Sequence, residues 1–274
     1  MILKGDCMAI NKWEGPHRIE LEFQRALFRF LMRVFNIPFD EGSSYIWNWN
    51  DALNQLAYTM AEKMVTQTLH STAKSWREAA ANSSNGRRIY EMLHNELQWP
   101  TGFKVLELIE QNAQLIRSLP QDMAQEINKK IFDATMSGNR PEAILKELLP
   151  DMAHNKAQLI ARTESAKAQT ALIQVRAENL GLNHYVWRTA TDQRVRSSHK
   201  HMQGIICSFD DPPAPEQLIG IKSTLGHYPP GGCPNCRCFP EIIVDIDDIG
   251  WPHECYVNGN VRTLGKRQFE RISG

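Results

Sequence analysis

The 274-residue sequence has no uninterrupted apolar run that approaches the ~18 residues of a membrane-spanning helix. Its first twenty residues also lack the long apolar core of a secretory signal peptide. We therefore expect a soluble protein, made in a reducing cytoplasm, with no membrane partner.

The sequence also lacks net charge, because 31 Lys and Arg residues balance 31 Asp and Glu residues. Without a positive excess, bulk binding of nucleic acid is not expected, and without an acidic excess, disorder is not expected. Weak local contact with DNA phosphates is an alternative to the more common solvated helix face for two groups of basic residues. These groups are Arg18, Arg25, Arg29 and Arg33, and Lys266, Arg267 and Arg271.

Apolar residues recur at helical spacing through the first 180 residues. The pattern predicts helices over residues 18–35, 50–81, 87–97, 103–117, 121–136, 141–149 and 155–180. Ser118 and Asn139 are expected to cap the starts of the fifth and sixth of these helices. Gly181, followed by Leu182, is expected to end the last one.

The character of the sequence changes after Gly181, where alternating segments and Pro- and Gly-rich loops replace the helical pattern. Strands are predicted near residues 184–190, 204–207 and 239–245. We predict an α+β protein: a mainly helical N-terminal half, then a small α+β module with a short β-sheet and Pro/Gly/Cys-rich loops. The expected units are a helical docking region over 1–150, the module over 151–245 and a peripheral C-terminal tail over 246–274.

Three of the six cysteines fall within residues 233–238, in the sequence CPNCRC. Cys233 and Cys236 have the two-residue spacing of a zinc knuckle, and Cys238 points to the same side as Cys236 on an extended chain. Simple burial of apolar thiols is the alternative interpretation. If a metal is bound, a structural zinc ion is favoured, because the irregular loops around the cysteines have few other means of stabilisation.

A structural zinc site needs a fourth ligand from elsewhere in the chain. His199 and His201 are the best candidates, since they lie at the end of the other unusual loop, just before a strand. His227 and Cys207 are weaker candidates.

The sequence gives less support to catalytic interpretations of the cysteines. A zinc deaminase needs His-x-Glu, but His199 is followed by Lys200 and His201. A thioredoxin-like redox centre needs a helix after its CxxC, and the segment after Cys236 is strand-like. A metal-dependent nuclease, in which His199 activates water beside a Cys-bound zinc, stays open as the enzymatic alternative.

Charged residues near His199 have two interpretations. Asp192 can cap a short helix, or it can form a buried ion pair with Arg194 that ties the loops together, with Glu164 and Arg162 as further partners. For Arg196 a surface position of little energetic consequence is favoured.

Three segments in order, ARTESA, WRTATDQRVRSSHKHMQG and PPGGCPNCRCFPE, resemble the phage Mu F-like head morphogenesis family. The resemblance covers about residues 155–244, and Cys233 is less characteristic of the pattern than the other matching positions. Those positions are Arg162, Glu164, Trp187, Asp192, Arg194, His199, Gly204, Cys236, Arg237 and Cys238.

The resemblance implies a minor head protein of a tailed bacteriophage rather than an enzyme. Such a protein is expected in the virion, inside the head near the portal, and in the host cytoplasm during assembly. Its implied partners are the portal protein and the major capsid or scaffolding protein, and its implied roles are head morphogenesis and DNA packaging or ejection.

Overall fold

The computed structural model describes residues 12–35, 44–81, 83–98, 100–136, 141–190 and 192–273. Up to residue 180 all the described elements are helices, and strands appear only after it. Their order is α1 (His17–Phe35), α2 (Ser44–Ala81), α3 (Gly86–Asn95), α4 (Thr101–Met136), α5 (Pro141–Asn179), β1 (His184–Arg188), α6 (Ser197–His201), β2 (Ile206–Ser208), α7 (Pro215–Leu218), β3 (Phe239–Ile242), the 3-10 helix η1 (Ile246–Asp248), β4 (His253–Val257), β5 (Asn260–Leu264) and α8 (Lys266–Ser273).

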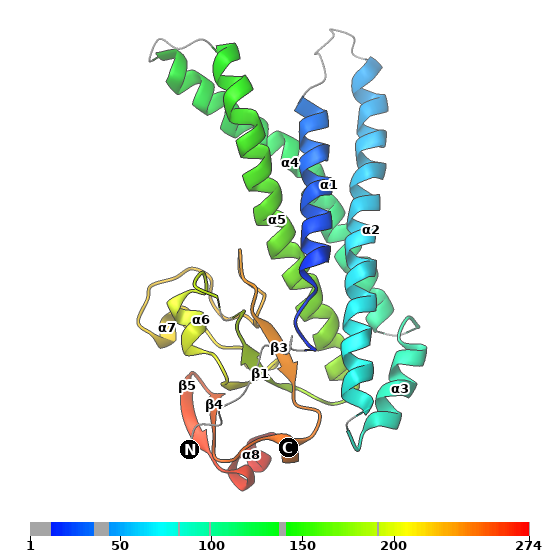
Figure 1. The fold of residues 1–274 in the computed structure, drawn as a ribbon, viewed down its shortest axis with the longest axis vertical. Helices are drawn as coiled ribbons and strands as arrows, with labels where there is room; N and C mark the ends of the chain where they lie inside the picture. Colours follow the sequence, from blue (N-terminus) through cyan, green and yellow to red (C-terminus); the bar gives the residue numbers. More distant parts are fainter. Residues whose placement is uncertain are drawn as a thin grey trace.

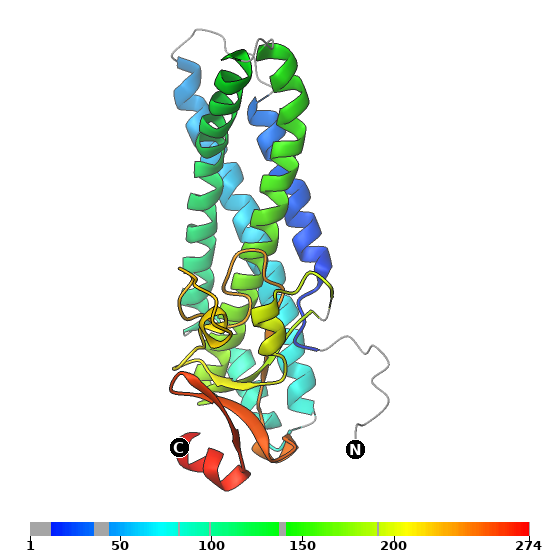
Figure 2. The same ribbon diagram turned by 90° about the vertical axis from the view of Figure 1, so that its left-hand side faces the viewer.

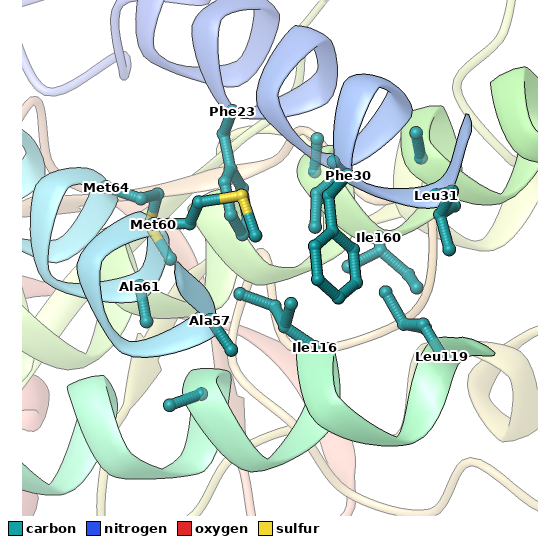
Figure 3. Close-up of a cluster of buried hydrophobic side chains, with 14 of the residues drawn as sticks. Phe23, Phe30, Leu31, Ala57, Met60, Ala61, Met64, Ile116, Leu119 and Ile160 are labelled. Atoms are coloured by element: carbon teal, nitrogen blue, oxygen red, sulfur yellow. The ribbon is translucent and has the colours of Figure 1, made fainter. Parts of the chain in front are cut away.

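Four long helices, α1, α2, α4 and α5, lie side by side in an elongated bundle (Figure 1). Figure 3 shows buried apolar side chains from all four helices meeting in its core, among them Phe23, Met60, Ile116 and Ile160. Each buried side chain of this size contributes ~1.5–3 kcal/mol, so the shared core, more than helix propensity, holds these helices together. Within the described residues, none of the helices combines the length and apolar character needed to cross a bilayer.

The two helix breaks expected near Pro120 and Pro150 are wrong, because α4 and α5 continue through both prolines. An interior proline costs ~3 kcal/mol or more. Around Pro120, however, Ile116, Leu119 and Met123 are all buried in the bundle core, and the burial of each contributes ~1.5–3 kcal/mol. Packing on both sides of the proline therefore outweighs its cost.

The expected helix caps at those breaks change accordingly. The Ser118 hydroxyl donates a hydrogen bond to the Leu115 carbonyl inside α4 (2.9 Å) and caps no helix. Asn139 lies outside the described residues. The predicted end of α5 is confirmed: Gly181 has φ +72°, and the Leu182 N–H donates to the Ala177 carbonyl at 2.8 Å, as in a glycine C-cap.

A five-stranded mixed sheet lies beside the end of α5, with strand order β3-β1-β2-β4-β5 (Figure 1). All neighbouring strands are antiparallel except β2 and β4, which are parallel. The strands predicted near residues 184–190, 204–207 and 239–245 are confirmed as β1, β2 and β3. The α+β class predicted from the sequence is therefore confirmed.

The sheet has apolar residues on both faces, and β1 shows the alternation directly. Tyr185 and Trp187 belong to the buried cluster that includes Trp76 of α2, so this face packs toward the bundle. Val186 belongs to the opposite cluster with Phe269 of α8. The sheet is therefore packed between the bundle end and the C-terminal helix, as Figure 2 also shows.

The peripheral tail expected after residue 245 is corrected by the structure. β4 adds to the sheet beside β2, with Ile206 opposite Cys255, and β5 pairs along the whole of β4. Only Cys255 and Tyr256 are buried in these two strands, so their sequence shows little of the alternation that predicts a strand.

Candidate metal centre

Four side chains from two segments that are distant in the sequence come together between the sheet and α5. The Nδ1 atom of His199, on α6, lies 3.5 Å from the Cys236 sulfur and 3.4 Å from the Cys238 sulfur. Its Nε2 atom lies 3.7 Å from the Cys233 sulfur. All four residues are buried, and we call them the His–Cys cluster.

Hydrogen bonds fix the orientation of the His199 ring. The Tyr228 hydroxyl donates to Glu216 at 2.7 Å and lies 3.0 Å from Nε2 of His199. Because that hydroxyl gives its proton to Glu216, it accepts the Nε2 proton of the imidazole, so that in the neutral form of the ring the Nδ1 lone pair faces two sulfurs. The ring also meets Trp187 edge-on, with ring centroids 5.5 Å apart. A second hydrogen-bond partner of this kind is typical of metal-ligating histidines.

Glu216, on the short helix α7, is the buried anchor of this network. It also accepts a hydrogen bond from the Ser198 hydroxyl at 3.0 Å. Burial raises the pKa of Glu216, but the hydrogen bonds from Tyr228 and Ser198 outweigh it, so the net pKa shift is downward. Glu216 is therefore ionised at neutral pH. Neither Glu216 nor Tyr228 stands out in the sequence, because only the fold brings them to His199.

Protein groups also contact the cysteine sulfurs. Arg196 donates to the Cys233 sulfur and to the Pro234 carbonyl, both at 2.9 Å. The Cys238 N–H donates to the Cys236 sulfur at 3.4 Å. These donors stabilise thiolates, which are the metal-binding form of cysteine. Arg196 is exposed, as the sequence favoured, but its side chain also contacts the cluster through the Cys233 sulfur.

In the metal-free protein, raised pKa values keep protons on Cys233 and His199, and protons on these groups oppose metal binding. Its hydrogen bond with Cys236, together with burial, raises the pKa of Cys233. Burial lowers the pKa of His199, but interactions with Cys233 and Cys236 outweigh it and raise that pKa to about 9. Metal binding at neutral pH must therefore release protons.

One face of α5 supports the cysteine loop. Thr163 accepts a hydrogen bond from the Asn235 N–H at 3.0 Å, and the Thr170 hydroxyl donates to the Pro230 carbonyl at 2.6 Å. These two threonines are seven residues apart, so they lie on the same side of the helix. Gly231 lies between them with φ +84°, where a β-carbon would be 2.7 Å from the Thr170 hydroxyl and 3.0 Å from the Ala166 carbonyl.

Gly231→Ala is expected to lower stability by about 1–3 kcal/mol, because it adds backbone strain and pushes the loop away from α5. Gly226→Ala is the matched control, since Gly226 also has positive φ (+68°) but has no atom within 4 Å of the added carbon. Urea denaturation of both variants measures the difference. Equal losses in the free energy of unfolding for the two variants would show that the contact with α5 does not contribute to stability.

The His–Cys cluster lies within a region that matches a known protein family. Residues 125–240 match the sequence model of the family described as phage Mu protein F like protein. These residues form a phage Mu F-like region. The match confirms the resemblance that the motifs indicated, and it begins earlier than those motifs, inside α4.

A relative with sequence similarity is an uncharacterized protein of Haemophilus influenzae (strain ATCC 51907 / DSM 11121 / KW20 / Rd). It is 30% identical over 147 residues, which are 53% of this chain and 30% of the relative. The matched stretch is thus less than a third of the relative's length. No solved structure matches the chain significantly. The Mu F-like match fits a phage head-related protein.

Charged residues of the Mu F-like motifs pair differently from the sequence expectation. The carboxylate of Asp192 pairs with Arg237 of the cysteine loop, and its contact with Arg194 is to the backbone N–H at 3.0 Å. The Asp192–Arg194 ion pair, one of the two interpretations from the sequence, is therefore wrong, although Asp192 does tie the two loops together. The sequence missed Arg237 as the partner because the loops meet only in the fold.

The two charged residues of α5 also find other partners. Arg162 pairs with Glu20 of α1 at 3.2 Å, and Glu164 pairs with Lys167 one turn along the helix at 2.9 Å. Neither forms an ion pair with Asp192 or Arg194 among the described residues. Arg162 therefore joins the Mu F-like region to the first helix of the bundle.

Gly204 turns the chain from α6 into β2. It has φ +86°, and its N–H donates to the Trp187 carbonyl at 2.9 Å. Its carbonyl also lies 2.8 Å from Nε2 of His253 on β4. The glycine thus positions β2 between β1 and β4.

The other proposed fourth ligands lie away from the cluster. His201 is exposed at the end of α6, and exposed His227 contacts the Pro212 carbonyl at 2.8 Å. Cys207 is buried on β2, with its thiol directed to the Ile205 carbonyl. Of the four candidates named from the sequence, the structure places only His199 at the cysteines.

The donor set of the cluster fits a structural zinc site. Three thiols and one imidazole are the Cys₃His set used by closed zinc sites, and here all four are buried. His199, Cys233 and Cys236 have ligand atoms that all lie within 4.8 Å of one another, so these three could hold a metal ion; Cys238, whose sulfur lies 3.4 Å from Nδ1 of His199, would be the fourth ligand. A bound zinc ion would crosslink α6 to the cysteine loop.

Proposed function

We propose that this chain is a minor head protein of a tailed bacteriophage that associates with the portal inside the capsid. The observation that carries the proposal is the Mu F-like match over residues 125–240, which includes the whole His–Cys cluster. The head-related character follows from that match, while the portal as partner and a part in DNA packaging or ejection are the proposed steps. Major capsid or scaffolding protein is the second proposed partner.

The architecture supports a docking protein. The bundle is long and narrow, and the Mu F-like module packs against one end of it (Figures 1 and 2). In this proposal the part of the bundle that lies within residues 1–150 docks onto the partner, and the module, which begins within α5, anchors it through a zinc-stabilised cluster.

Co-purification with portal oligomers tests the proposal. The full chain and the portal protein, produced together, are expected to elute as one complex, and the protein is expected in purified proheads and virions. Absence from both particles would contradict the proposal.

A nuclease that works through His199 is less well supported. His199 is 2% exposed, and its nitrogens face Tyr228 and the cysteines. A general base needs access to water and the scissile phosphate. We expect no divalent-metal-dependent cleavage of plasmid DNA by the purified protein. Cleavage that His199→Ala abolishes, with the fold retained by circular dichroism, would instead favour the nuclease.

A further inference from the structure

A cavity of about 200 Å³ opens beside the His–Cys cluster, and four arginines line it. They come from three segments of the chain. Arg162 belongs to α5, Arg194 and Arg196 to the loop before α6, and Arg237 to the cysteine loop. Asp192 contributes the only carboxylate among the described lining residues.

Among the described residues, most of the guanidinium N–H groups around this cavity have no protein acceptor. Each guanidinium has five N–H donors. Arg162 donates from Nε to Glu20, and Arg237 donates from Nη2 to Asp192. Among the residues that the structure describes, no acceptor contacts the side chain of Arg194. Arg196 donates two hydrogen bonds, to the Cys233 sulfur and the Pro234 carbonyl.

The charge around the cavity is also incompletely balanced. Glu20 and Asp192 pair with Arg162 and Arg237. Arg196 contacts the Cys233 sulfur and forms no ion pair with a carboxylate among the described residues. Arg194 is left as a cation with no carboxylate partner in the described part of the chain. Arg194 is exposed and can be solvated by water, but the spare donors from three segments around one cavity match the oxygens of an anionic ligand.

The arrangement favours a phosphate group over a carboxylate. A carboxylate presents two oxygens in one plane, and a single arginine fork satisfies both. Here the spare donors of Arg162, Arg194 and Arg237 reach one cavity from separate segments, which suits the several oxygens of a tetrahedral anion. Arginine is also the residue best matched to bidentate phosphate binding.

We propose that this cavity is a phosphate-binding site, with Arg194 as its uncommitted cation and Arg162 and Arg237 as supporting donors. The inference goes beyond the proposed docking function and does not rest on it. The phosphate can come from a small molecule or a strand terminus, or from a nucleic-acid backbone. These sources share one chemistry and are separated by the experiment.

Thermal unfolding of the full-length protein as purified tests the site. Inorganic phosphate is expected to raise Tm relative to chloride at equal ionic strength, because a ligand that binds only the folded state stabilises it. Arg194→Gln removes charge-assisted hydrogen bonds, each worth ~1.5–3 kcal/mol, so it is expected to weaken phosphate binding at least tenfold. Arg88→Gln is the matched control, since Arg88 is exposed on α3, away from the cavity.

Fluorescence anisotropy then identifies the source of the phosphate. Binding of a short single strand only when it carries a 5′-phosphate would assign a terminal phosphate, and equal binding without it would assign the backbone. The proposal is overturned if sodium glutamate raises Tm as much as phosphate does. It is also overturned if Arg194→Gln, shown by elemental analysis to keep its metal, binds phosphate like the unaltered protein.

Discussion

Cys236→Ser is expected to yield protein without zinc and with a strongly lowered Tm. Removal of one thiolate from a Cys₃His set leaves too few ligands for a closed site, and the same loss is expected for Cys238→Ser. In small zinc domains the apparent metal-binding free energy is ~10–16 kcal/mol, because the metal supplies nearly all of the stabilisation. Here the cysteines belong to a larger apolar cluster with Trp187 and Phe239, so part of the module keeps its packing. The expected loss is thus smaller than in a zinc finger but above the ~1 kcal/mol of an average substitution.

Elemental analysis of protein purified without chelators measures the metal, and calorimetry with and without a chelator measures its contribution to Tm. We expect a single zinc ion per chain. Cys255→Ala is the matched control, because Cys255 is also a buried free cysteine but lies on β4, outside the cluster. Metal-free protein whose Tm does not respond to added zinc would contradict a structural zinc site.

The helices and their ends were predictable wherever local signals agree with the fold. Gly181 ends α5 as its sequence indicates, because positive φ and the following apolar residue are local properties. Pro120 and Pro150 misled the prediction, since their cost is local but the burial that outweighs it comes from other helices. Continuity of a helix through proline therefore cannot be inferred without knowing its packing partners.

The members of the His–Cys cluster were predictable from the sequence, but the residues that support the cluster were not. The spacing of Cys233, Cys236 and Cys238 and the position of His199 indicated the cluster that the fold assembles. Tyr228 was missed because its contact with His199 crosses 29 positions and depends on how the Pro- and Gly-rich loop folds. Strands β4 and β5 were missed for a related reason: they extend one side of the sheet and bury few residues, so their sequences are mostly polar.

A buried arginine joins three helices at the end of the bundle nearest the module. Arg176 of α5 is 0% exposed. It donates to Glu96 after α3 at 2.6 Å, to the Leu69 carbonyl of α2 at 3.1 Å, and to the Thr72 hydroxyl. Burial lowers the pKa of its guanidinium, and the interaction with Glu96 opposes that shift. The charge is thus kept in the interior by its partners.

Arg176→Met is expected to destabilise the protein by about 3–5 kcal/mol, because it leaves the largely buried Glu96 carboxylate (13% exposed) and the Leu69 carbonyl without their donor. Replacing both charges is expected to cost less: the double variant Arg176→Met/Glu96→Gln removes the uncompensated carboxylate and should recover part of the loss. Urea unfolding of the two single variants and the double variant gives the coupling energy directly. Arg88→Met, on the exposed face of α3, is the control and should change stability little.

A cost below ~1 kcal/mol for Arg176→Met would show that the three helices are held by apolar packing alone, since that is the scale of an ordinary surface change. A large cost with strong coupling to Glu96 would mean that this ion pair fixes where α3 packs against α2 and α5, next to the Mu F-like sheet.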